Sequence, residues 1–267
     1  MTKIGILGAN GRMGRVLIEA IYQHQSLELS LASVRDGSSF VGIDVGQLAG
    51  IANQNLALTS ISECEFGQTD VLIDFTLATA LDANLEKACE QAIPIVIGTT
   101  GLSESQLSRL DEAAKHIPIV FAANYSVGVN LMLNLVKQAA LVMGEQSDIE
   151  ILEAHHRFKQ DSPSGTAMAI GKSIADTLNR DLAQCAVYGR EGFSETRDRQ
   201  TIGFATVRAG DIVGEHTALF ASLGERLEIT HKASSRMTFA NGALEAANWL
   251  VGKPKGLYSM QDVLGLA

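Results

Sequence analysis

The sequence has few cysteines, and their spacing indicates neither a metal site nor a disulfide framework. Cys64, Cys89 and Cys185 are scattered, odd in number and without CxxC spacing. No apolar run is long enough to span a bilayer. The first residues lack the basic segment and apolar stretch of a secretory leader. We therefore expect a protein of the cytoplasm.

Positive charge is also scarce. The 21 Lys and Arg residues stand against 30 Asp and Glu, which gives a net charge of −9 and makes binding to nucleic acid by bulk electrostatics unfavourable. The hydrophobic content of 46% excludes a disordered chain, and 267 residues suffice for one large domain or two modest ones. In so acidic a chain, an anionic ligand must be held by a local basic cluster.

One short segment, residues 155–159, contains such a cluster with the sequence His-His-Arg-Phe-Lys. It follows a predicted strand at residues 148–154 and precedes the turn Ser164-Gly165-Thr166 and a predicted helix at residues 167–178. Histidine exchanges protons near neutral pH, and neighbouring cations lower its pKa and favour an anionic ligand. Backbone N–H groups at a helix start also attract a carboxylate. The pattern predicts a pocket for a small anion beside an acid–base group; the alternative is a solvated basic loop before a capped helix.

The N-terminal residues have the pattern of a dinucleotide-binding βαβ unit. An apolar strand at residues 3–7 leads into Gly-Ala-Asn-Gly-Arg-Met-Gly at residues 8–14, and a predicted helix follows. The glycines permit a sharp turn and the approach of backbone N–H groups to a pyrophosphate. The spacing is GxxGxxG, with Ala9 in the place of the first glycine of GxGxxG. The alternative is an ordinary tight turn.

The residues after the second predicted strand, residues 27–34, bear on the choice of cofactor. A site that prefers NAD usually has Asp or Glu there to bind the ribose hydroxyls. This sequence has Val34 followed by Arg35, and an arginine can accept a 2′-phosphate. The sequence therefore favours NADP(H); the alternative is a surface arginine in the turn at residues 36–39.

Strands and helices alternate over the first half of the chain. Strands are expected at residues 71–76, 94–97 and 118–121, with helices at 77–91 and 104–115, where Ser103 is the expected N-cap. The strand ends at Thr76, 98–100 and 122–126 should lie at one edge of the sheet, where ligands of doubly wound sheets bind. This part is predicted to be a Rossmann-like domain with a parallel sheet.

The pattern changes after Val187. Three segments, at residues 201–208, 212–221 and 226–231, are typical of antiparallel strands, and a closing helix is expected at 239–250. The predicted fold is α/β. Residues 1–126 and 237–267 should form a dinucleotide-binding domain, and residues 127–236 an α+β substrate-binding and oligomerisation domain with an open mixed sheet. Two helices, at residues 130–143 and 167–178, would cover one face of that sheet, and the uncovered face, with apolar residues such as Phe204, Val207, Ile212, Leu219 and Phe220, should be buried by symmetric assembly.

Taken together, six motifs resemble those of the bacterial dihydrodipicolinate reductases, also called 4-hydroxy-tetrahydrodipicolinate reductases. The resemblance covers essentially the whole chain in the family's order, and the histidine–lysine segment is its most specific part. One departure is Val34, where the family often has a carboxylate. The motifs are the glycine loop at residues 8–14, Asp74-Phe75-Thr76, Gly98-Thr99-Thr100-Gly101, the segment at residues 122–126, the segment from Glu153 to Thr166, and residues 230–236.

The resemblance implies the NAD(P)H-dependent reduction of 4-hydroxy-tetrahydrodipicolinate to tetrahydrodipicolinate with loss of water, in lysine and diaminopimelate biosynthesis. It implies that His155 is the proton donor or acceptor, that Lys159 is a second proton donor, and that His156, Gly165 and Thr166 contact the substrate. It further implies NADPH or NADH as cofactor, a homotetramer, and no metal. The implied cofactor contacts are Gly8, Ala9, Asn10, Gly11, Arg12, Met13, Arg35, Gly98, Thr99, Thr100, Ala122, Ala123, Asn124 and Tyr125.

Two other classes of function compete with this interpretation. A different NAD(P)-dependent dehydrogenase with two domains, acting on an amino acid, would share the N-terminal half but gives no reason for residues 155–166. A non-catalytic NADP-binding redox sensor would need no clustered acid–base group. A steady-state assay with NADPH and candidate dicarboxylates separates the sensor from an enzyme.

Overall fold

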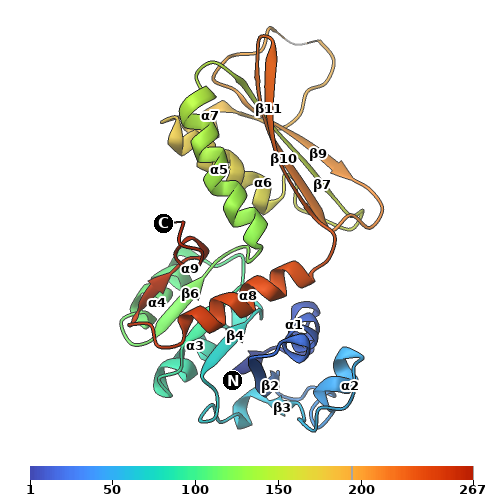
Figure 1. The fold of residues 1–267 in the computed structure, drawn as a ribbon, viewed down its shortest axis with the longest axis vertical. Coiled ribbons are helices and arrows are strands. Elements are labelled where there is room, and N and C mark those ends of the chain that lie inside the picture. The colour runs from blue at the N-terminus through green and yellow to red at the C-terminus, as the bar shows by residue number, and fades with distance from the viewer. Residues whose placement is uncertain (194, 267) are drawn as a thin grey trace. The chain divides into compact units, whose positions relative to one another are not determined.

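The computed structural model describes residues 1–193 and 195–266 and divides the chain into two compact units. The first unit consists of Met1–Val127 with Arg236–Ala267, and the second of Gly128–Ser235 (Figure 1). The ligand-binding and assembly roles predicted for the two parts of the chain stay predictions. No helix in the described ranges is long and apolar enough to cross a membrane.

The first unit contains a seven-stranded sheet in the order β12-β6-β5-β4-β1-β2-β3. All of its strand pairs are parallel, which confirms the predicted parallel sheet. Short, almost entirely apolar strands such as β4 and β5 are buried because helices cover both faces. The strands are β1 (Thr2–Leu7), β2 (Leu27–Val34), β3 (Thr59–Ser60), β4 (Val71–Asp74), β5 (Ile95–Ile97), β6 (Pro118–Phe121) and β12 (Gly256–Tyr258).

Two apolar layers enclose this sheet. Helices α1 (Arg12–Gln23), α8 (Met237–Leu250) and α9 (Met260–Val263), together with α2 (Val45–Ala49), pack against one face. Helices α3 (Leu81–Glu90) and α4 (Glu104–Ala113) pack against the other. Ser103 caps α4 through a capping box with Gln106, as its sequence position predicted. The unit is therefore a doubly wound α/β structure whose strand ends meet at one edge.

The second unit has a mixed five-stranded sheet in the order β11-β10-β7-β9-β8. Helices α5 (Val127–Met143) and α6 (Gly165–Thr177) cover one face of it, as Figure 1 shows. The strands are β7 (Asp148–His155), β8 (Ala186–Val187), β9 (Ile202–Arg208), β10 (Gly214–Ser222) and β11 (Glu225–Ala233). The mixed sheet confirms the predicted fold class.

One detail of the predicted second sheet was wrong. β9 does not pair with β10: it lies on the other side of β7 and pairs with β7 in parallel, although it runs in the opposite direction to β10. The pattern of residues along a strand indicates which faces are buried, but not which strand lies beside it. Phe204 and Phe220 face the helices and are buried, so they are not part of the uncovered face, whereas Leu152 and Val207 on that face are exposed.

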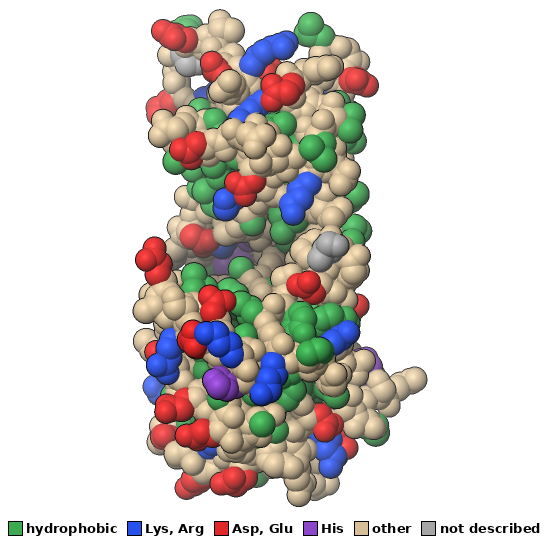
Figure 2. Space-filling model, turned by 90° about the vertical axis from the view of Figure 1, so that its left-hand side faces the viewer, with side chains coloured by type: hydrophobic (Ala, Val, Ile, Leu, Met, Phe, Trp, Pro, Cys, Tyr) green, Lys and Arg blue, Asp and Glu red, His purple; other side chains and the backbone are tan. Residues whose placement is uncertain are grey.

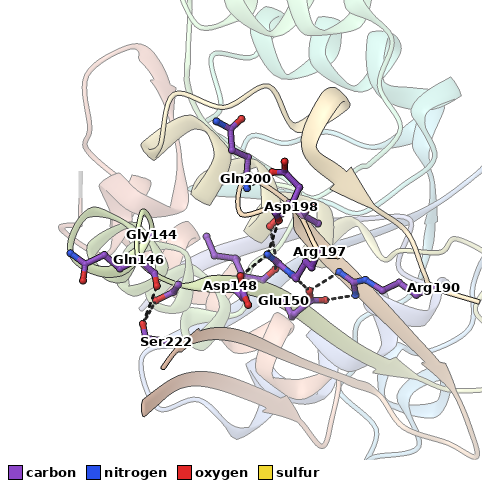
Figure 3. A network of polar contacts seen from close by, with 12 residues as sticks. Gly144, Gln146, Asp148, Glu150, Arg190, Arg197, Asp198, Gln200 and Ser222 are labelled. Carbon is purple, nitrogen blue, oxygen red and sulfur yellow. Dashed lines mark hydrogen bonds and ion pairs between the residues drawn. The ribbon is translucent and has the colours of Figure 1, made fainter. Parts of the chain in front are cut away.

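Two arginines from the segment between β8 and β9 bind carboxylates of β7. Arg197 donates to Asp148 and Glu150 of β7 at 2.9 and 3.1 Å, and Arg190 makes a bidentate pair with Glu150. Figure 3 shows both guanidinium groups directed at Glu150.

Several short elements were not predicted from the sequence, namely α2, β3, β8, β12, α9, α7 (Leu182–Cys185) and the 3-10 turns η1 (Ile61–Glu63) and η2 (Ala78–Ala80).

Acidic and basic side chains are intermingled on the face drawn in Figure 2, which agrees with the acidic composition. The binding of an anion therefore depends on local groups, such as those around His155 and around the glycine loop.

Candidate active site

The helix-covered face of the second sheet is apolar at one end and polar at the other. Side chains alternate along β7, so Ile149 and Ile151 are followed on the same buried face by Glu153 and His155. In the ladder, Arg208 of β9 is opposite His155, and His216 of β10 is opposite Glu153. Register therefore assembles a carboxylate, a guanidinium and two imidazoles from three strands.

Glu153 is the centre of this cluster. Its Oε2 lies 2.6 Å from His155 Nδ1 and 2.8 Å from Arg208 Nη1, and its Oε1 lies 2.9 Å from Arg208 Nη2. The backbone N–H of Ser164 also donates to Oε1, at 3.1 Å. Burial raises the pKa of Glu153, but the hydrogen bonds from Arg208, His155 and Ser164 outweigh burial and hold it below its usual value. The carboxylate is therefore ionised at neutral pH.

His155 is only 8% exposed. Burial lowers its pKa, Glu153 raises it in part, and the charges of Lys159 and Arg208 lower it further. A Cβ at Gly214 would lie 3.1 Å from His155 Nε2, so the glycine at the start of β10 leaves this edge of the ring uncovered. The arrangement can hold a proton at Nε2 while Nδ1 is engaged by Glu153.

The loop after His155 brings a cation and a second carboxylate together. Lys159 Nζ lies 2.7 and 2.9 Å from the two carboxylate oxygens of Asp161. Burial raises the pKa of Asp161, but Lys159 and the backbone N–H of Gly165 lower it below the usual range. The Asp161 carboxylate therefore binds Lys159 and the turn at Gly165, which the sequence predicted to bind an anionic ligand.

Helix α6 begins over the polar end of the sheet. Ser164 is its N-cap and accepts from the Ala167 N–H at 3.1 Å, and its Oγ lies 2.9 Å from His216 Nε2. Burial and the neighbouring His155 lower the pKa of His216 to about 4, so this imidazole is neutral at pH 7. Gly165 and Thr166 form the first turn of the helix, and a Cβ at Gly165 would meet nothing within 4 Å.

His156 lies beside this loop. Its Nδ1 is buried and has no hydrogen-bond partner within residues 1–193 and 195–266. The neighbouring Phe158 is 79% exposed, and the two rings lie 6.3 Å apart. An orphaned polar nitrogen of this kind is a candidate ligand-binding group.

In the first unit, a cavity of about 580 Å³ lies along the glycine loop. Gly8 has a positive φ of 71°, and a Cβ there would come within 2.7 Å of Thr76. A Cβ at Gly14 would come within 2.4 Å of the Ala9 carbonyl, so glycine permits α1 to start close to the loop. The described residues therefore fit a nicotinamide dinucleotide. Of the predicted cofactor residues, the cavity is lined by Gly8, Asn10, Gly11, Arg12, Met13 and Arg35.

The other predicted cofactor residues do not line this cavity. Ala9 is buried beneath the loop, where its N–H donates to the Ser33 carbonyl. Residues 98–100 and 122–125 follow the adjacent strands β5 and β6, and Thr99 Oγ1 donates to the carbonyl of Thr76, which does line the cavity. The side chain of Tyr125 is 1% exposed, and its hydroxyl donates to the Ile97 carbonyl at 2.8 Å. This buried side chain therefore stabilises the ends of the strands.

Sequence reasoning missed three side chains of the polar cluster. Glu153 was quoted in a motif but given no role, although strand alternation alone places it on the face of His155. Arg208 and His216 could not be recognised in this way, because their nearness to His155 depends on the order of β9, β7 and β10 in the sheet.

Within the described residues, no group of three or more His, Cys, Asp or Glu side chains could hold a metal ion.

Two family models match the chain. The model described as "Dihydrodipicolinate reductase, N-terminus" matches residues 2–125, and "Dihydrodipicolinate reductase, C-terminus" matches residues 128–264. Together they span almost the whole sequence and meet near the boundary between the two compact units.

Full-length relatives agree with the family models. The 4-hydroxy-tetrahydrodipicolinate reductase of Pseudoalteromonas atlantica is 66% identical over 100% of both chains, and that of Alkalilimnicola ehrlichii is 59% identical over 99% of both. Among solved structures, a dipicolinate-bound dihydrodipicolinate reductase from Paenisporosarcina sp. TG-14 has the same fold, with a TM-score of 0.76, 23% identity and 98% of both chains covered. The chain belongs to the dihydrodipicolinate reductase family of oxidoreductases.

Proposed function

We propose how this chain performs the reaction that its family membership assigns to it, the reduction of 4-hydroxy-tetrahydrodipicolinate in lysine biosynthesis. The reaction takes up a hydride and a proton, releases water and gives tetrahydrodipicolinate. The observation that carries the proposal is the buried His155, paired with Glu153 at 2.6 Å and followed by a loop whose cation and turn already bind one carboxylate.

His155 supplies the proton in this proposal. Addition of a hydride to the conjugated ring leaves electron density that a positioned acid must neutralise. The imidazole is nearly buried and its Nδ1 is engaged by Glu153, so Nε2 is the nitrogen that exchanges a proton with the substrate. Reduced nicotinamide, when bound, supplies the hydride.

The two carboxylates of the substrate are recognised by groups that lie after β7. Lys159, the N–H groups of Gly165 and Thr166, and His156 supply a cation and hydrogen-bond donors, which orient the ring and offset its negative charge. The Asp161 carboxylate occupies part of this set. We propose that a substrate carboxylate shares or replaces its contacts. Steady-state oxidation of the cofactor by the parent and by variants at His155 and Lys159 tests these assignments.

The family implies a nicotinamide cofactor, and we propose that NADPH and NADH both serve, bound along the glycine loop. The predicted contacts Gly8, Asn10, Gly11 and Met13 line the cavity with Arg12 and Arg35. Two guanidinium groups in an otherwise acidic protein favour a dinucleotide that carries an additional phosphate. The cofactor contacts at residues 98–100 and 122–125 stay predictions from the resemblance.

Replacing Arg35 by alanine is expected to raise the KM for NADPH about tenfold or more while it leaves the KM for NADH nearly unchanged. Only NADPH has the 2′-phosphate that the guanidinium can bind, and a hydrogen bond between charged groups contributes about 1.5–3 kcal/mol. Steady-state kinetics with the two cofactors, at saturating dicarboxylate substrate, measures the difference. Equal losses with NADH and NADPH would mean that Arg35 stabilises the loop rather than binding phosphate.

We further propose that the chain assembles as a homotetramer through the uncovered face of the second sheet. Leu152 and Val207 are exposed there, which is unfavourable for an isolated chain. One chain has a mass of 28.4 kDa, and light scattering at micromolar concentration should give four times this value. A stable, active monomer would contradict the proposal. A cytoplasmic location remains a prediction from the sequence.

A further inference from the structure

The contacts of Glu153 carry an inference about the chemistry of His155. We infer that Glu153 is a positioning residue, which binds Nδ1–H of His155 in both protonation states and so restricts proton exchange to Nε2, and that Arg208 holds Glu153 in that position. The inference rests on the proposed role of His155 as the proton donor.

The hydrogen bond between Glu153 and His155 defines the position of one imidazole proton. An ionised carboxylate only accepts hydrogen bonds, so the 2.6 Å contact with Glu153 Oε2 requires a proton on His155 Nδ1. Both side chains are buried, with Glu153 at 3% exposure, so water does not compete well for this contact. A neutral His155 then carries its free lone pair on Nε2, and a charged His155 carries its transferable proton there.

Glu153 is held in place by contacts other than the one with His155. Arg208 binds both of its oxygens with two parallel N–H donors, and the Ser164 N–H occupies Oε1. Thr206 Oγ1 donates to Oε1 at 3.3 Å. Arg208 also donates to the Asp161 carbonyl at 2.6 Å. One carboxylate therefore connects the proton donor, the β9 strand and the turn that is proposed to bind the substrate.

Charged groups surround His155 on several elements. The titratable and charged groups around His155 are Glu153 on β7, Lys159 on the following loop, Arg208 on β9 and His216 on β10, whose ring packs edge-on at 5.0 Å. Of the charged neighbours that shift the pKa of His155, Glu153 raises it, while Lys159 and Arg208 lower it. During turnover the proton passes from Nε2 to the substrate, and Glu153 stays ionised throughout because the imidazole retains its Nδ1 proton.

Glu153→Gln tests the inference because an amide keeps the size of the side chain but removes its charge. We expect kcat to fall by roughly 10²-fold, at the lower end of what general acid catalysis contributes. In the pH profile of kcat/KM, the decline that accompanies loss of the His155 proton should move to lower pH, since the group that raises the pKa of His155 is gone. Glu153→Asp keeps the charge, so in that variant the decline should lie closer to its position in the parent.

Glu150→Gln is the matched control. Glu150 lies on the same strand and, like Glu153, is a carboxylate bound by arginine, but its partners are Arg190 and Arg197, and its hydrogen bonds within the described part of the chain involve no histidine (Figure 3). This variant should have the same pH profile of kcat/KM as the parent, even if it lowers the melting temperature. A Glu153→Gln variant that folds like the parent and has the same kcat and pH profile would overturn the inference. Equal shifts of the pH profile in Glu153→Gln and Glu150→Gln would also overturn it.

A measurement on the resting protein separates this inference from the proposed function. With 15N-labelled histidine, the ring-nitrogen shifts of neutral His155, assigned by their loss in His155→Gln, report the tautomer. The inference requires the Nδ1–H tautomer in the parent and its loss or mixing in Glu153→Gln. An Nε2–H tautomer in the parent would refute the role of Glu153 whatever the activity, whereas parental turnover by His155→Gln would refute the proposed function.

Discussion

His155→Gln is expected to lower kcat by about 10²–10⁴-fold, the range that general acid–base catalysis contributes. The substitution keeps a polar side chain of similar length but cannot release a proton near neutral pH. Since His155 lies in the second unit and the glycine loop in the first, the KM for NADPH should change little. Steady-state kinetics at saturating substrate measures both quantities.

His116→Gln is a suitable control for this experiment. His116 is exposed and follows α4 in the first unit, and the chemical change is the same. The control should retain parental kcat. If His155→Gln turned over within about threefold of the parent, His155 would not be the proton donor, and another group would have to protonate the ring.

Lys159→Ala is expected to lower kcat/KM by roughly 10- to 100-fold, because a hydrogen bond to a charged group contributes about 1.5–3 kcal/mol. Part of the loss should be a higher KM for the dicarboxylate, since the variant lacks a cation that binds it. A further part should be a lower kcat if Lys159 also donates a proton. The affinity for NADPH should not change.

Lys172→Ala provides the comparison for the lysine variant. Lys172 lies on α6 and pairs with Asp176 at 2.9 Å, so it too is a lysine bound to an aspartate, but it is exposed and outside the polar cluster. Its loss should not affect the kinetics. Unchanged kcat and KM in Lys159→Ala would remove Lys159 from the substrate site and leave its pair with Asp161 as a structural contact.

The parallel sheet of the first unit was predictable because its strands are short, buried on both faces and separated by amphipathic helices. Strand β2 has the predicted bounds, Leu27–Val34, and α4 begins after its predicted cap, Ser103. Several predicted ends were too long: the strand expected to reach Thr76 ends at Asp74. Ends depend on capping and on tertiary packing more than on the intrinsic preference of each residue.

The second sheet was harder to predict, because the order of its strands is decided by contacts between distant segments. No property of residues 201–208 shows that they pair with β7 in parallel. The same limit concealed Arg208, which reaches Glu153 only through that pairing. Glu153 itself was accessible to sequence reasoning, since it lies two residues before His155 on a strand and so shares its face.

In the candidate sites, residue type was easier to predict than the direction of the side chain. Histidine, lysine and a capped turn in one segment indicated acid–base chemistry beside an anion, but not that Asp161 would already bind Lys159. The cofactor contact expected of Tyr125 stays a prediction, but its buried hydroxyl binds the Ile97 carbonyl, a direction that the sequence did not indicate. A sequence motif places a backbone near a site, while packing decides which way each side chain turns.

The most direct test of the central claim is the oxidation of NADPH and NADH in the presence of the condensation product of pyruvate and aspartate semialdehyde. We predict oxidation that requires both the protein and this substrate, with one tetrahydrodipicolinate formed for each cofactor oxidised. The rate should fall to near background in His155→Gln. If neither cofactor were oxidised faster than in the absence of protein, or if the oxidation did not depend on the dicarboxylate, the assigned reaction would be contradicted.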